Sequence, residues 1–334
     1  VHIEVTGSVT WNVILENTNS IVSEGRSDDA IVISNLPTGV HSLTIETQQA
    51  SETLQLIISP RTAPSVLQET GADRLWGVNL ALYGLHSSSR SGIGNYGDLA
   101  HASEQLASCG ADFVGINPAH AIGWSNPEVT SPYSPSHRGF LNTNHLACNI
   151  IAPISDQSQS QLLASKSRES VAPADLVDYD DHLHNHRPLL RALYDDFINR
   201  ASPAHRAKFE EYCRKGGVEL QRFIEYEGAS ERLGANWHHW PTVLQNSEPD
   251  DPSLKSRETF HAWLQWQAEN QLQTAQNSAI SKGMALGLYL DLAVGSRRDG
   301  AEAWSARASI ADGVSIGAPP DHLSPAGQNW NLAA

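Results

Sequence analysis

Apolar and polar side chains alternate with a period of two along about the first 60 residues. The stretches VHIEVTG, WNVILEN, AIVISN, HSLTIETQ and ETLQLIIS each place apolar residues on one face of an extended chain and polar residues on the other. Turn-forming residues separate them, as in the NLPTG of residues 35–39. Short alternating strands with such turns predict a small antiparallel β-sandwich over residues 1–62.

The next segment, PRTAPSVLQETGA, has no hydrophobic period and carries two prolines among polar residues. Both features are typical of a connection between domains. We therefore predict a linker over residues 63–73.

After Arg74 the pattern changes to near-continuous apolar runs, WGVNLALYGL and FVGINPAHAI, which are typical of strands buried on both faces of a parallel sheet. Between them, residues 98–110 carry a helical apolar stripe that ends at a glycine. This order predicts a right-handed βαβ unit of a parallel sheet or barrel. A third strand is predicted at 285–295 (ALGLYLDLAVG), after a long helix from about residue 257 to 282.

A polar and helical pattern separates the second strand from the third. Segments such as HRPLLRALYDDFIN and AHRAKFEEYCRKGGVELQRFIEYEGASERL predict an all-helical insertion. We place this insertion at residues 156–275, and the parallel-sheet domain at 74–155 and 276–334.

Charge and composition exclude several kinds of partner. With 37 acidic and 22 basic residues the net charge is −15, so no basic surface is predicted for nucleic acid or for an anionic membrane. No apolar run approaches the length of a membrane span, and no basic-then-apolar leader opens the chain. The three cysteines lack a CxxC pair, which predicts no disulfide, no zinc site and a cytoplasmic protein. Nine Trp and eight Tyr supply amphipathic rings that suit sugar ligands.

Two motifs suggest a cofactor or a metal, and both have simpler interpretations. Gly92, Gly94 and Gly97 have the G-x-G-x-x-G spacing, but the second strand ends in Asn-Pro and not in the acidic residue of a dinucleotide fold, so we interpret them as loop geometry. His182, His184 and His186 alternate as metal ligands on an extended chain would. We interpret that stretch as a solvated loop, because Asp residues and a proline flank it. No cofactor and no metal are predicted.

Four stretches follow predicted strands, where parallel α/β enzymes carry their chemistry. They are GLHSSSRSGIGNYGDL, PAHAIGWSNPEVTSPYSPSHRGFLN, DLAVG and the terminal PPDHLSPAGQNW. With GADFVGINPAHA and GLYLDLAVG, their order and spacing closely resemble bacterial 4-alpha-glucanotransferases, the amylomaltases or disproportionating enzymes of glycoside hydrolase family 77. The resemblance covers about residues 74–334, while LPTGVHSLTI resembles the N-terminal extensions of longer bacterial members.

This resemblance implies a (β/α)8 barrel of the TIM type, of which the chain carries the first part. It also implies retaining transfer of α-1,4-glucan segments, which requires two carboxyl groups roughly 5 to 5.5 Å apart. In the family these carboxyl groups come from an Arg-x-Asp-His motif and a Glu-Asp-Leu-Gly motif, with a third Asp near a Thr-His-Asp motif, and this sequence contains none of the three. We therefore expect the catalytic carboxylates beyond Ala334 and an inactive fragment. A non-catalytic α-glucan-binding protein and a related α-glucan hydrolase are the alternatives.

The resemblance carries six substrate-binding positions over to this chain. They are Ser131, Tyr133, Asp291, Asp321, Gln328 and Trp330. Without the family match, each of three residues has a structural alternative. Tyr133 could equally be a turn residue, Trp330 could pack against the rest of the protein, and Asp291 could cap the next turn. The expected ligands are α-1,4-glucans and maltooligosaccharides, and we expect the open edge of the barrel to pair with a second copy of the chain.

Overall fold

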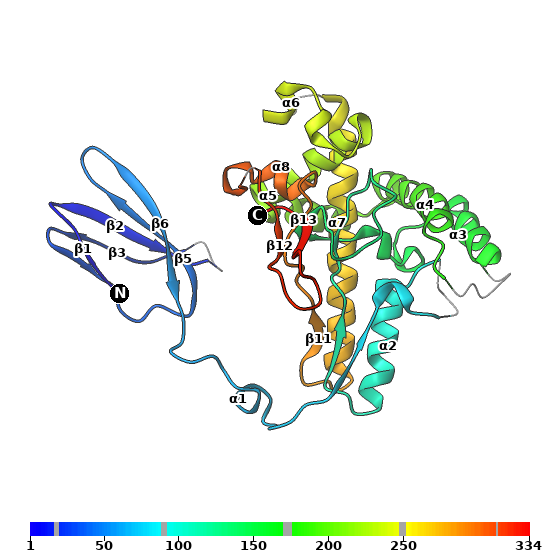
Figure 1. The fold of residues 1–334 in the computed structure, drawn as a ribbon, viewed down its shortest axis with the longest axis horizontal. Coiled ribbons are helices and arrows are strands. Elements are labelled where there is room, and N and C mark those ends of the chain that lie inside the picture. Colours follow the sequence, from blue (N-terminus) through cyan, green and yellow to red (C-terminus); the bar gives the residue numbers. More distant parts are fainter. Residues whose placement is uncertain (17–19, 88–91, 170–175, 247–251, 312) are drawn as a thin grey trace. The chain divides into compact units, whose positions relative to one another are not determined.

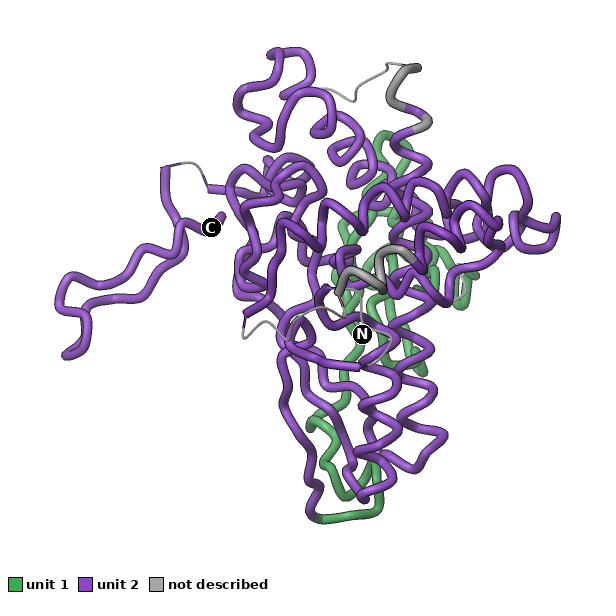
Figure 2. The backbone as a smooth tube through the Cα atoms, turned by 90° about the vertical axis from the view of Figure 1, so that its right-hand side faces the viewer, with its two compact units in different colours: residues 1–73 green, residues 74–334 purple. Residues whose placement is uncertain are grey.

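The chain of the computed structural model divides after Asp73, into unit 1 (Val1–Asp73) and unit 2 (Arg74–Ala334) (Figure 2). The structure describes residues 1–16, 20–87, 92–169, 176–246, 252–311 and 313–334. Part of the GLHSSSRSGIGNYGDL stretch, residues 88–91, therefore lies outside the described residues.

Unit 1 consists of two antiparallel sheets that share one small core. The four-stranded sheet has the order β3 (Ile21–Ser27), β2 (Val9–Ile14), β5 (Gly39–Glu46), β6 (Ser51–Ile58), and the two-stranded sheet pairs β1 (His2–Glu4) with β4 (Ala30–Val32). Alternation along β2 buries Val9, Trp11 and Val13, which pack with Ile31 of β4 and Leu43 of β5. The predicted period of two thus decides which face of each strand enters the core.

The segment predicted as a linker contains one short helix, α1 (Val66–Thr70). Ser65 and Gln68 form a capping box at its start, and Gly71 ends it in the left-handed conformation. The prediction overlooked these end signals because the helix is too short to show an apolar period.

Unit 2 contains a parallel sheet whose three strands are neighbours in chain order: β7 (Gly77–Leu80), β8 (Phe113–Ile116) and β11 (Gly287–Leu290). In this register Leu80, Ile116 and Leu290 lie in one row, so all three strands end at the same edge. The predicted βαβ unit is present, with α2 (Tyr96–Ser108) between β7 and β8. This helix begins two residues earlier than predicted, because Asn95 and Asp98 form a capping box.

Long helices make up much of unit 2. They are α3 (Asp156–Glu169), α4 (Tyr179–Arg200), α5 (Pro203–Leu233) and α7 (Pro252–Ser281), with the shorter α6 (Thr242–Asn246) and α8 (Ala301–Ser305). Helix α7 packs against both α2 and α5 and contacts the sheet at β11 (Figure 1). One hydrophobic core therefore runs from the sheet, at Val114, through α7, at Trp263, into α4 and α5.

The predicted border of the insertion at residue 275 falls inside α7, which continues to Ser281. The predicted subdivision of residues 74–334 stays a prediction.

Short elements complete unit 2. They are the strands β9 (His120–Ala121), β10 (His137–Leu141), β12 (Ile316–Ala318) and β13 (Gln328–Leu332), and the 3-10 turns η1 (Leu82–Gly84), η2 (Thr143–His145), η3 (Cys148–Ile150), η4 (Trp237–His239) and η5 (Arg307–Ser309). β9 pairs with β10, and β12 with β13, as antiparallel hairpins.

The interpretation of residues 182–186 (HLHNH) as a solvated loop is wrong. These residues lie in α4, and His182 and His186 are buried one helical turn apart on the same face. The His182 Nε2 atom is hydrogen bonded to the carbonyl oxygen of Asn144 at 3.1 Å, and His186 contacts the Cys148 thiol. Burial lowers the pKa of His186 well below its ordinary value. Pro188 misled the prediction, since the helix continues through it.

All three cysteines are free thiols. Within the described ranges, no cluster of three or more His, Cys, Asp or Glu side chains is placed to hold a metal ion. No helix among the described residues is both long and apolar enough to cross a bilayer.

Candidate functional site

An open cleft of about 720 Å³ lies at the carboxyl ends of the three parallel strands. The segments after β7, β8 and β11 line it, together with the connection between β9 and β10. Its lining residues are Asn79, Leu80, Ala81, Tyr83, Gly115, Ile116, Asn117, Ser131, Pro132, Tyr133, Tyr289, Leu290 and Asp291. This edge is where parallel α/β folds present ligand-binding residues.

Tyr133 and Asp291 meet in this cleft. The Asp291 carboxylate lies close enough to the Tyr133 phenol to affect its ionisation, while the Tyr133 side chain stays 56% exposed. Partial burial and then the negative charge of Asp291 raise the pKa of Tyr133 above its ordinary value. An open aromatic face beside a carboxylate offers a ligand both a stacking surface and a hydrogen-bond acceptor.

Ser131 lies in the same lining, and its hydroxyl accepts a hydrogen bond from the Tyr133 amide at 3.4 Å. The hydroxyl therefore stabilises the turn that presents the tyrosine. Three of the six predicted site residues, Ser131, Tyr133 and Asp291, are thus brought to one cleft.

Asp321, Gln328 and Trp330 lie elsewhere, on the β12–β13 hairpin, and none of them lines the cleft. This hairpin projects from the body of unit 2 (Figure 2). The Asp321 carboxylate accepts hydrogen bonds from the backbone amides of the following turn, at 2.8 and 2.6 Å. The indole of Trp330, 42% exposed, donates to the Gln328 side chain at 2.9 Å. A role of these three residues in ligand binding stays a prediction.

Sequence reasoning missed Tyr83, Asn117 and Tyr289 as cleft residues. All three lie in or next to apolar runs that we interpreted as buried on both faces, yet Tyr289 is 66% exposed. The Asn117 side chain accepts a hydrogen bond from the Leu82 amide at 2.7 Å and so connects the segments after β7 and β8. Tyrosines within such runs are the signal that could have identified this side of the cleft, because their hydroxyls resist full burial.

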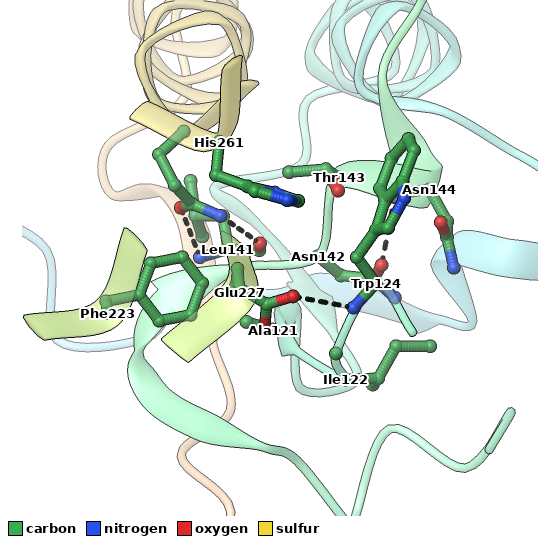
Figure 3. A pocket seen from close by; sticks show the side chains of 12 residues that line it. Ala121, Ile122, Trp124, Leu141, Asn142, Thr143, Asn144, Phe223, Glu227 and His261 are labelled. Atoms are coloured by element: carbon green, nitrogen blue, oxygen red, sulfur yellow. Dashed lines mark hydrogen bonds between the residues drawn. The ribbon is translucent and has the colours of Figure 1, made fainter. Parts of the chain in front are cut away.

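A second, much smaller cavity of about 20 Å³ lies behind the β9–β10 connection (Figure 3). Glu227 of α5 borders it, and one of its carboxylate oxygens accepts a hydrogen bond from the Trp124 amide at 2.9 Å. The other oxygen, Oε1, is buried and has no partner among the described residues. Burial raises the pKa of Glu227. The cavity is large enough for a water molecule and too small for a sugar ring.

Glu227 therefore fixes the start of the segment that leads to Tyr133. A second contact joins the same two elements, since the hydroxyl groups of Ser125 and Ser230 are hydrogen bonded at 2.9 Å. Ser131 and Tyr133 of this segment line the cleft, while Trp124 and Ser125 near its start are bonded to α5.

Residues 80–334 match the family model of glycoside hydrolase family 77, described as 4-alpha-glucanotransferase. The chain is 35% identical over 351 residues to the 4-alpha-glucanotransferase of Haemophilus influenzae. The aligned region covers 96% of this chain and 49% of that protein. It is 30% identical over 318 residues to the 4-alpha-glucanotransferase of Mycobacterium tuberculosis, and this aligned region covers 90% of this chain and 43% of that protein.

Solved structures agree with these relatives. The amylomaltase of Corynebacterium glutamicum superposes with a TM-score of 0.79 at 26% identity, over all of this chain and 48% of that chain. The amylomaltase of Streptococcus agalactiae in complex with acarbose has a TM-score of 0.64 at 18% identity, over 78% of this chain and 53% of that chain. The chain spans about half the length of the relatives it matches. By its family match and its relatives, the chain belongs to the 4-alpha-glucanotransferases of glycoside hydrolase family 77.

Proposed function

We propose that this chain forms part of the substrate-binding groove of a 4-alpha-glucanotransferase that acts on α-1,4-glucans and maltooligosaccharides. The observation that carries the proposal is the meeting of Tyr133 and Asp291 at the carboxyl edge of a parallel sheet, within a chain of this family. A glucose ring stacks on the exposed face of Tyr133, and its hydroxyl groups donate to the Asp291 carboxylate.

The fold supports a more detailed proposal. Strands β7, β8 and β11 are parallel and lie side by side in chain order, as the first three strands of a (β/α)8 barrel would. We propose that unit 2 is the first part of such a barrel, with α3–α6 as an insertion, and that the two sheets of unit 1 are a β-sandwich extension.

The chemistry requires groups that this sequence lacks. Retaining transfer needs a nucleophilic carboxylate and an acid/base carboxyl group roughly 5 to 5.5 Å apart. The family motifs that supply them are not present in residues 1–334. We therefore propose that these residues bind and orient the glucan but do not cleave it.

Two measurements test this proposal. The 334-residue chain should bind maltotriose in calorimetry and should release no glucose from it. A longer protein that includes the missing motifs should convert maltotriose into glucose and longer glucans. Glucose release by the 334 residues alone would contradict the assignment of the chemistry. Only shorter products from the longer protein would indicate a hydrolase, and binding without any activity there would indicate a non-catalytic glucan-binding protein.

We also propose that the chain works in the cytoplasm and self-associates through β11. Among the described residues β11 pairs only with β8, and Leu290, Leu292 and Val294 are exposed beside it. An unpaired edge with exposed apolar residues favours pairing with a second copy. Light scattering that shows a monomer at high concentration would exclude this pairing.

A further inference from the structure

We propose that His120 is a positioning residue for Asp291: its imidazole holds the backbone that follows β11 and so sets where the Asp291 carboxylate lies in the cleft. This inference rests on the proposed function, because it concerns the geometry of the same groove.

The contact itself is direct and buried. The Ala293 amide, two residues after Asp291, donates to Nε2 of His120 at 3.1 Å. His120 lies in β9 and is 9% exposed, and Ala293 is also buried. The residues on either side of Ala293, Leu292 and Val294, are exposed. The imidazole therefore holds a buried amide that lies between two exposed residues.

A second tether comes from the partner strand of β9. Arg138 of β10 donates from Nη1 to the carbonyl oxygen of Val294 at 3.2 Å. Glu302 of α8 orients this guanidinium, with Oε1 2.6 Å from Nη2, and also accepts a hydrogen bond from the Arg138 amide at 2.9 Å. The segment after β11 is thus held at two successive positions by one hairpin.

The same hairpin presents the other side of the cleft. Its connection, between Ala121 and His137, carries Ser131 and Tyr133. The β9–β10 hairpin and its connection therefore contribute to both sides of the cleft. The hydrogen bond from the Ala293 amide to His120 lies two residues after Asp291. A shift of that contact would misplace the carboxylate relative to the tyrosine without removing either group.

The hydrogen bond requires an unprotonated Nε2, so the neutral imidazole carries its proton on Nδ1. Burial and then Arg138 lower the pKa of His120, while Glu302 and Asp291 oppose that shift. His137 of β10 also faces this group, and burial lowers the pKa of His137 to about 4. A histidine with a lowered pKa stays neutral to a pH below its ordinary range. The tether is therefore present at neutral pH and is lost only as the pH falls through that lowered value.

The test compares His120→Phe with His120→Gln in the 334-residue chain. Phenylalanine keeps a flat ring in the buried site and removes the acceptor, whereas the glutamine amide oxygen can accept from Ala293. We expect His120→Phe to weaken maltotriose binding about tenfold, the scale of one lost hydrogen bond, and His120→Gln to stay within about threefold of wild type. His41→Phe, at a buried imidazole of unit 1, is the matched control and should bind as wild type does.

A purely structural role would not produce the pH behaviour that we expect. Binding by the wild type should weaken as His120 becomes protonated, and His120→Gln should weaken less over the same range. Hydrogen exchange of residues 291–295 gives a readout without ligand, when it is expressed as a protection factor relative to the intrinsic rate at each pH. The protection factors of these amides should be lower in His120→Phe than in wild type, and lower in wild type when His120 is protonated.

The outcomes separate the two proposals. No binding of maltotriose by the wild type would contradict the proposed function. Binding by the wild type that His120→Phe leaves unchanged, or that His120→Gln weakens as much as His120→Phe does, would overturn the role of His120 alone. If His120→Phe fails to fold, an unchanged protection factor at the Ala293 amide across the pH titration of the wild type would overturn it equally.

Discussion

The cleft and the β12–β13 hairpin each carry three of the predicted sugar contacts, and they differ in how those contacts are held. In the cleft, Tyr133 and Asp291 come from distant parts of the chain and are placed by tethers from α5, β9 and β10. On the hairpin, the side chains of Asp321 and Trp330 bond to neighbours within three residues. Geometry in the cleft therefore depends on tertiary packing, and geometry on the hairpin depends on local turns.

This difference predicts where a substitution acts. Removing a hydrogen bond that tethers the cleft should shift Tyr133 or Asp291, although neither is the substituted residue. A substitution on the hairpin should act only on the residue concerned and its turn.

Glu227→Ala should have the strongest effect. It leaves the Trp124 amide without its acceptor and enlarges the cavity, so we expect a loss of about 2–3 kcal/mol in the free energy of unfolding. Denaturant unfolding measures this loss, and maltotriose binding should weaken as the segment before Tyr133 loosens. Glu227→Gln keeps an acceptor and is the control. Equal losses of unfolding free energy in the two variants would show that the hydrogen bond from the Trp124 amide does not account for the loss.

The same carboxyl group predicts a dependence on pH. Its pKa is raised by burial, so the folded state binds the proton more tightly than the unfolded state does. The contribution of Glu227 to stability should therefore be largest at low pH and should fall as the pH rises from the ordinary carboxyl range through the raised pKa. Glu227→Gln cannot titrate, and the difference in stability between it and wild type should change over that range. A constant difference would contradict the raised pKa.

Tyr133→Ala should weaken maltotriose binding about tenfold, because it removes the stacking surface while leaving Asp291 in place. Calorimetric titration measures the change. Tyr133→Phe keeps the ring and removes only the hydroxyl group beside Asp291, so it should bind more like wild type. If the two variants weaken binding equally, the hydroxyl and not the ring face is the contact.

Trp330→Ala should weaken maltotriose binding by about threefold or less, since its indole is partly exposed and lies outside the lining of the cleft. Unfolding free energy should change by under about 0.5 kcal/mol, as for other surface positions. A loss of binding as large as that of Tyr133→Ala would show that the hairpin and the cleft contact the same glucan.

Asp321→Ala should have the smallest effect on binding. It removes the acceptor for two amides of an exposed turn, which predicts faster hydrogen exchange at Leu323 and Ser324 and an unchanged cleft. Asp321→Asn keeps an acceptor in the same place and should preserve the turn. Altered exchange at residues 291–295 in Asp321→Ala would contradict the independence of the two regions.

Much of the fold could be predicted from local patterns. The period of two along β2, the βαβ order of β7, α2 and β8, and the long helix α7 all follow from the spacing of apolar residues. Errors arose where short-range signals compete. Pro188 argued for a break that the packed helix α4 tolerates, and Asn95 capped α2 earlier than its apolar stripe begins.

The motifs in this sequence determine family and the chemical types at each site, because residue identity and spacing along the chain are local properties. The meeting of Tyr133 with Asp291, the bond from Ala293 to His120 and the burial of His182 were decided by the tertiary structure. Each depends on strand register and on which helix face meets the core. These join residues far apart in the chain, so no stretch of sequence encodes them on its own.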